Sequence, residues 1–102
     1  MSRPPRLADA EVSARLAALP GWSLSGGRLR REFVFHDFSQ AFGFMSRAAL
    51  AAEKRDHHPD WSNVWNRVTV ELWTHDAGGL TSLDFELAAE MSRLAGSGRS
   101  GT

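Results

Sequence analysis

Three of the four histidines in this 102-residue chain lie in two short segments whose residue types suit proton transfer. His57 and His58 are adjacent and precede Pro59, and His75 lies seventeen positions after His58. The imidazole ring changes its charge near neutral pH, so imidazoles that meet in space can take up and deliver protons at a flat organic molecule. Acid–base catalysis is therefore the first functional hypothesis.

Two carboxylates and a large aromatic residue flank the histidine pair. Glu53 and Asp56 precede it, and Trp61 follows it. A carboxylate can orient an imidazole or bind the polar edge of a ligand, and an indole can stack on a flat ring. The same residues also fit ordinary roles at a helix surface or in strand packing. We treat these three as candidate ligand-binding residues, whereas His36 fits a structural role at an element boundary.

A metal site is the main chemical alternative, because three histidines and a carboxylate can hold zinc. The spacing argues against it, since His57 and His58 are neighbours that tend to point in different directions, and the helical His-x-x-x-His pair is absent. The chain also has no cysteine, which excludes thiolate ligands and nucleophiles. We expect no metal and no other cofactor.

Charge and hydropathy limit the possible partners. The twelve basic and twelve acidic side chains cancel, so no overall field attracts nucleic acid or anionic lipid. The N-terminal residues do not resemble a signal peptide, and no stretch is long and apolar enough to span a bilayer. We expect a cytoplasmic protein with no nucleic-acid or membrane partner.

Hydrophobic spacing predicts three helices and four strands. The helices are expected near 9–19, 37–55 and 81–96, and the strands near 22–25, 29–35, 61–65 and 68–73. Strands joined as hairpins, with helices between the pairs, predict an α+β fold of two layers: a four-stranded antiparallel sheet with three helices on one face, in the order α-β-β-α-β-β-α. We expect a single domain over residues 7–96, with flexible termini at 1–6 and 97–102.

The predicted elements bring the histidines together. His57 and His58 lie where the long helix gives way to a strand, and His75 lies just past the end of the last strand. If the second hairpin pairs back on itself, its two open ends place these three imidazoles close to one another. The side of the sheet without helices is expected to carry polar groups and tryptophans, which favours a homo-oligomer.

Local patterns add more detailed expectations. In the long helix an apolar stripe is expected to face the core: Phe38, Ala41, Phe42, Met45, Ala49 and Ala52. Arg31 interrupts the alternation of its strand and leaves the register there open. The second hairpin is expected to turn at Asn66 and Arg67, with Asn66 in the left-handed position. Asp84 lies three residues after Thr81 and is expected to complete a helix-capping arrangement.

The run 53–68, the segment 74–81 and Asp84 together resemble the pterin-4a-carbinolamine dehydratase family. The His-His-Pro and Thr-His-Asp pieces are the most specific parts, and the resemblance covers nearly the whole domain. It implies helices packed over an antiparallel sheet and a homodimer or homotetramer. The implied activity is that of a 4a-hydroxytetrahydrobiopterin dehydratase, a hydro-lyase that converts 4a-hydroxytetrahydropterin to quinonoid dihydropterin and so supports the recycling of the pterin cofactor of aromatic amino acid hydroxylases.

Residue roles follow from the same resemblance. It implies catalytic histidines at His57, His58 and His75, pocket residues at Glu53, Asp56 and Trp61, and no metal or redox cofactor. The reaction needs a proton delivered to the hydroxyl at C4a and a proton removed from N5. His58 and His75 are expected to handle these protons, while His57 orients the hydroxyl or shares the acid role.

Two residues depart from the family pattern. Trp65 stands where a tyrosine or other aromatic residue is frequent, and Trp73 stands where a smaller residue is expected.

Two other functions stay open. The chain could instead be a non-catalytic interaction module, acting as a dimerisation cofactor or a hydroxylase partner, or a metal-binding regulator. The complete histidine set favours the dehydratase, because a scaffold has no chemical need for it.

Overall fold

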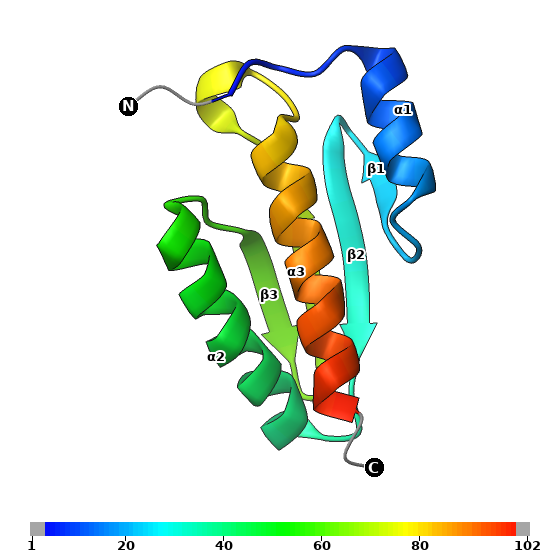
Figure 1. Cartoon of the computed structure of the whole chain (residues 1–102). Helices are drawn as coiled ribbons and strands as arrows, with labels where there is room; N and C mark the ends of the chain where they lie inside the picture. The colour runs from blue at the N-terminus through cyan, green and yellow to red at the C-terminus, as the bar shows by residue number, and fades with distance from the viewer. Residues whose placement is uncertain (1–3, 100–102) are drawn as a thin grey trace.

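The structure, a computed structural model, describes residues 4–99 and has two layers (Figure 1). Its elements in chain order are α1 (Asp9–Ala17), β1 (Ser23–Ser25), β2 (Arg28–Val34), α2 (Phe38–Arg55), β3 (Asp60–Val64), β4 (Arg67–Leu72), the 3₁₀ turn η1 (His75–Ala77) and α3 (Ser82–Arg99). The strands form one antiparallel sheet in the order β1-β2-β4-β3, and the helices lie on one side of it. The predicted α+β fold is confirmed.

Side-chain alternation along the central strands fixes which face of the sheet the helices cover. Val68, Val70 and Leu72 of β4 are fully buried beneath the helices, while Thr69 and Glu71 point to the other side. Burying these branched side chains is the main force that closes the two layers, at about 1.5–3 kcal/mol for each fully buried residue. The helix layer and the sheet therefore share one core.

Arg31 keeps the regular register of β2. It is paired with Val70 of β4, so its side chain lies on the helix-covered side of the sheet. The guanidinium lies 4.3 Å from the Phe33 ring centroid and donates to the Ser92 hydroxyl at 3.0 Å. A long side chain of this kind can bury its stem and still place its charged end at the edge of the core. The strand therefore needs no bulge at this position.

The predicted stripe on the long helix is only partly correct. The buried positions of α2 are Ala41, Phe44, Ala48 and Ala52. The predicted core residues Phe38 and Phe42 are 48% and 56% exposed, and Ala49 is also exposed. Small residues on the packed face allow α2 to approach α3 closely, so the core stripe is less apolar than the one beside it. A prediction from hydrophobicity alone therefore places the larger side chains in the core.

The turn between β3 and β4 lies one residue earlier than predicted. Val64 pairs with Arg67, so the turn residues are Trp65 and Asn66. The left-handed backbone belongs to Trp65, with φ of 50°, rather than to Asn66. The Asn66 amide instead donates to the carbonyl of Phe35 at 2.9 Å. Phe35 directly follows β2 and is 31 positions from Asn66, so the local pattern does not predict this contact.

The last helix extends beyond residue 96, where it was predicted to end. Helix α3 continues to Arg99, so residues 97–99 belong to the helix, and residues 1–3 and 100–102 lie outside the described part of the chain.

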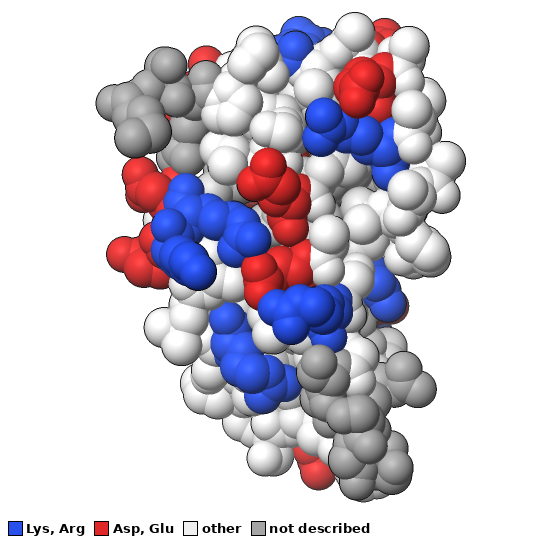
Figure 2. All heavy atoms as spheres, viewed as in Figure 1, with Lys and Arg blue, Asp and Glu red and all other residues white. Residues whose placement is uncertain are grey.

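Acidic and basic side chains lie next to one another on the helix-covered side (Figure 2). Among the described helices, none has the length and apolar character needed to cross a membrane.

Candidate active site

The three candidate catalytic histidines line one hollow at the end of the sheet. Antiparallel pairing of β3 with β4 brings the exit of α2 next to the end of β4, as predicted. The hollow has a volume of about 420 Å³. Its lining residues are His57, His58, Pro59, Asp60, Trp73, Thr74, His75 and Asp76. Imidazoles from two remote segments therefore share one solvent-facing space.

The end of α2 places His57 by a regular capping motif. Asp56 adopts the left-handed conformation, with φ of 51°, and its N–H donates to the carbonyl of Glu53 at 3.1 Å. The N–H of His57 donates to the carbonyl of Ala52, also at 3.1 Å. These two bonds define a Schellman motif. The motif reverses the chain direction and turns the His57 ring beneath α3.

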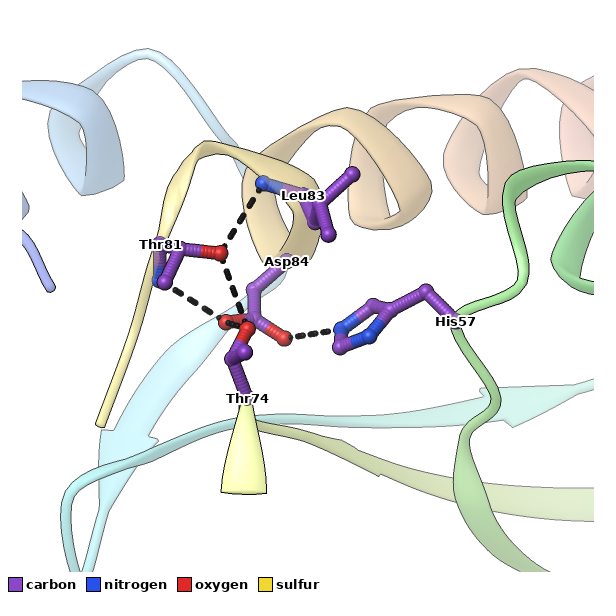
Figure 3. Close-up of polar contacts among 5 residues, drawn as sticks. All are labelled: His57, Thr74, Thr81, Leu83 and Asp84. Carbon is purple, nitrogen blue, oxygen red and sulfur yellow. Dashed lines mark hydrogen bonds and ion pairs between the residues drawn. The ribbon is translucent and has the colours of Figure 1, made fainter. Parts of the chain in front are cut away.

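A buried carboxylate on α3 binds the His57 ring (Figure 3). Asp84 is fully buried, and its Oδ1 lies 2.6 Å from Nε2 of His57. Its Oδ2 accepts hydrogen bonds from the Thr74 hydroxyl at 2.8 Å and from the Thr81 N–H at 2.9 Å. The Thr81 hydroxyl in turn accepts from the Leu83 N–H at 3.2 Å. The predicted capping by Asp84 is confirmed, but this carboxylate also joins α3 to His57.

This contact determines which ring nitrogen of His57 can meet a ligand. A carboxylate accepts, so the proton of a neutral His57 lies on Nε2. Within residues 4–99, Nδ1 of His57 has no hydrogen-bond partner, and no side-chain nitrogen or oxygen there is both buried and unpaired. Nδ1 is therefore the atom that His57 presents to the hollow.

His58 is oriented by a second carboxylate at the surface. Its Nε2 lies 2.8 Å from Oε1 of Glu53, and the two side chains are 56% and 78% exposed. An exposed pair of this kind adds little to stability, because water screens it. Its effect is on geometry, because the pair occupies Nε2 of His58 and leaves Nδ1 as the ring nitrogen that can meet a ligand.

His75 begins a tight loop that is fixed at both ends. The N–H of Thr74 donates to the carbonyl of Gly79 at 3.0 Å, and the N–H of Gly79 returns a bond to Thr74 at 3.3 Å. Gly78 closes the loop with φ of 73°, a conformation that glycine adopts without steric cost. Because the Thr74 hydroxyl also binds Asp84, the same carboxylate fixes both His57 and the base of the His75 loop.

None of the three candidate ligand-binding residues lines the hollow. Trp61 is paired with Val70 and packs against the core on the helix-covered side, so it is absent from the lining, as are Glu53 and Asp56. Trp73, which the sequence marked only as a departure from a pattern, lines the hollow instead. In the described part of the chain, no three His, Asp or Glu side chains are placed to hold a metal ion.

Comparison with known sequences gives one consistent family. The model of the family described as "Pterin 4 alpha carbinolamine dehydratase" matches residues 5–94. A Bradyrhizobium protein is 56% identical over 92 residues, which cover 88% of this chain and 92% of that protein. A Solibacter usitatus protein is 50% identical over 90 residues, which cover 88% of this chain and 95% of that protein. Both are named "Putative pterin-4-alpha-carbinolamine dehydratase".

A solved structure agrees with these sequences. The crystal structure of a protein from Brucella melitensis, described as a transcriptional coactivator/pterin dehydratase, has a TM-score of 0.86 and 49% sequence identity. The match covers 88% of this chain and 98% of that one. The chain therefore belongs to the pterin-4a-carbinolamine dehydratase family.

Proposed function

We propose that this protein catalyses the dehydration of 4a-hydroxytetrahydropterin to quinonoid dihydropterin. The observation that carries the proposal is the convergence of His57, His58 and His75 on one hollow. Its volume of about 420 Å³ falls within the range of about 300–1,000 Å³ usual for small-molecule sites. Membership of the family supplies the substrate class.

The reaction needs one acid at the hydroxyl on C4a and one base at N5. The C4a–O bond breaks, and the hydroxyl leaves as water after receiving a proton. The N5–H bond breaks as well, and its electron pair forms the new double bond between N5 and C4a. One imidazolium and one neutral imidazole supply these steps, and each well-placed group contributes roughly a hundredfold to ten-thousandfold in rate.

The geometry supports different roles for the three rings. His58 and His75 are exposed at the rim and can exchange protons with solvent between turnovers, so we assign them the protons at C4a and N5. His57 is buried and fixed by Asp84, which suits a group that orients the hydroxyl or shares the acid role. The product would return to the reductive recycling of the cofactor of an aromatic amino acid hydroxylase.

A direct assay tests this proposal. 4a-Hydroxytetrahydropterin is generated chemically, and its breakdown is followed with the wild type and with His58→Ala and His75→Ala. We expect each substitution to lower kcat roughly a hundredfold or more. His36→Ala serves as the control, because His36 is exposed at the junction of β2 and α2 and does not line the hollow.

The same assay separates the dehydratase from an interaction module. A folded wild-type protein that leaves the uncatalysed breakdown rate unchanged would rule out the enzymatic function and favour a scaffold. Unchanged turnover in His58→Ala or His75→Ala, with the circular dichroism of the folded protein intact, would remove that residue from the mechanism.

A further inference from the structure

A second hollow adjoins the first. It has a volume of about 390 Å³ and shares two lining residues, Trp73 and His75, with the histidine-lined hollow. It lies among the segment before α1, the turn between β1 and β2, and the loop before α3. The residues that bear on its chemistry are Arg6, Asp9, Arg28, Trp73, His75 and Gly79. A ring held by the histidines would meet this space at Trp73 and His75.

Arg6 is held at the second hollow although it falls within the predicted flexible terminus. The neighbouring Leu7 N–H donates to the carbonyl of Leu80 at 2.8 Å, which ties this segment to the loop before α3. The Arg6 side chain lies against Gly79, where an added Cβ would come within 2.8 Å of the Arg6 Nε. Among residues 4–99, Arg6 has no ion-pair partner. Its guanidinium charge is therefore available to a ligand.

Arg28 stacks on Trp73, which lines both hollows. Its guanidinium lies 3.6 Å from the Trp73 ring centroid, and it donates to Glu71 at 3.0 Å. Arg28 lines only the second hollow, whereas Trp73 lines both. The guanidinium of Arg28 therefore holds the indole in place, and its N–H donors already bind Glu71. Arg6 is the cation that can respond to a ligand.

One cation at the second hollow remains unpaired in the described part of the chain. The lining carries two guanidinium groups, Arg6 and Arg28, and one carboxylate, Asp9. Glu71 pairs with Arg28, so Arg6 is the cation that is left without an ion-pair partner among residues 4–99. A guanidinium pairs with phosphate or carboxylate through charge-assisted hydrogen bonds, which are roughly twice as strong as neutral ones.

We propose that the second hollow binds an anionic substituent, a phosphate or a carboxylate, carried on the side chain of a pterin whose ring occupies the histidine-lined hollow. Arg6 is the residue that recognises the anion, and Gly79 is required for its position. The inference rests on the proposed function, since it assumes a pterin ring between the histidines. It adds a preference among pterins that the dehydration chemistry itself does not require.

Binding of two matched ligands tests the inference. Quenching of tryptophan fluorescence gives Kd for 7,8-dihydroneopterin and for its monophosphate, which differ only by the phosphate. We expect the wild type to bind the monophosphate about three- to tenfold more tightly, and this gain to shrink at high salt. Arg6→Gln should abolish the gain and leave the affinity for dihydroneopterin unchanged, and Gly79→Ala should reduce it by displacing Arg6.

Two further arms complete the experiment. Arg47→Gln removes an exposed positive charge on α2. Arg47 lines neither hollow, so this variant should keep the gain. 7,8-Dihydrofolate, whose tail ends in carboxylates, separates the two anions: a gain that Arg6→Gln abolishes extends the site to carboxylates, and its absence assigns phosphate. Equal wild-type affinity for dihydroneopterin and its monophosphate, or a gain that survives Arg6→Gln, overturns the inference while leaving the proposed function intact. Failure of every pterin to bind removes both.

Discussion

At the scale of single residues, the geometry of the site depends most on Asp84. Its carboxylate receives His57 on one oxygen and Thr74 and the Thr81 N–H on the other, all within 2.9 Å. A buried acceptor with three donors is costly to alter, because each donor left unpaired costs about 1–3 kcal/mol. The arrangement joins His57 and Thr74, the residue just before His75, to α3.

Replacing Asp84 by Asn should therefore affect both folding and turnover. The amide keeps the volume but cannot accept on both sides, so we expect a loss of about 1–3 kcal/mol in the free energy of unfolding. We expect kcat to fall about ten- to a hundredfold, as when the partner that orients a functional imidazole is removed. Urea denaturation and the pterin assay measure these two effects.

The ¹⁵N chemical shifts of His57 distinguish positioning from simple destabilisation. The wild type should show the proton of neutral His57 on Nε2, and Asp84→Asn should show a mixture of tautomers. A variant that keeps the Nε2–H tautomer and full turnover would show that Asp84 serves the helix cap alone.

Thr74 offers a second prediction at this scale. Thr74→Val preserves the shape but removes the hydroxyl that joins Asp84 to the loop of His75. We expect a loss of about 1–2 kcal/mol in stability and a lower kcat, whereas Thr74→Ser should retain both because it keeps the hydroxyl. Equal turnover in Thr74→Val and the wild type would mean that the loop needs no support from Asp84.

The sequence predicted the histidines and the cap but not the bond between them. His57 and Asp84 are 27 positions apart, and each had an adequate local explanation. One signal was present: Asp84 shares a helical face with Leu87, Ala88 and Met91, which are fully buried. A carboxylate at a core position of a helix needs a partner, and an imidazole was the available one.

At the scale of elements, the end of α2 is joined to α3 just before the histidines. Arg55 donates to Glu90 at 2.8 Å, and Glu90 also pairs with Arg93. The hydrogen bond from Arg55 is the main reason that the pKa of the Glu90 carboxyl is held below its usual value. The pair therefore stabilises the packing of α2 on α3, from which His57 and His58 emerge.

This pair predicts a pH dependence of stability. A carboxyl with a lowered pKa in the folded state stabilises the protein above its unfolded pKa and loses that contribution as the pH falls through its folded pKa. Glu90→Gln should be less stable than the wild type at pH 7, and the difference should vanish in acid, below the usual value near 4.5. Glu86→Gln, an exposed carboxylate on the same helix, is the control. A difference that persists unchanged in acid would show that Glu90 acts by packing.

Periodicity predicts the elements well, but only part of the buried face of α2. The pattern predicts α2 but places Phe38 and Phe42 in its core stripe, because their size and hydrophobicity favour them over alanine. The packing distance between helices decides such cases, and that distance is set by both partners. The turn at Trp65 was displaced for a similar reason, since a contact between Asn66 and Phe35 fixed the role of the asparagine.

At the scale of the whole molecule, the apolar side chains left at the surface are the main feature that the single chain does not explain. Phe38 and Phe42 stack with their ring centroids 5.7 Å apart on the outer side of α2, and Leu50 on the same helix is 72% exposed. Exposed apolar patches commonly mark association sites. We propose that the protein is a homo-oligomer, as the sequence predicted, and that α2 contributes to the contact.

Sedimentation velocity tests this proposal. The wild type should sediment as a dimer or tetramer, and Phe42→Glu should shift it to a smaller species, because a charge in a buried contact is costly. Glu86→Gln again serves as the control. A wild type that sediments as a monomer at all concentrations would leave the exposed phenylalanines without this role.

The central claim is that His57, His58 and His75 surround one ligand, and histidine NMR tests it most directly. The chain has only one other histidine, His36, which serves as an internal control. Titration with 7,8-dihydrobiopterin should shift the imidazole resonances of the three site histidines together, with one Kd, and leave His36 unchanged. Saturable binding that leaves His57 and His75 unshifted would place the pterin elsewhere and contradict the account.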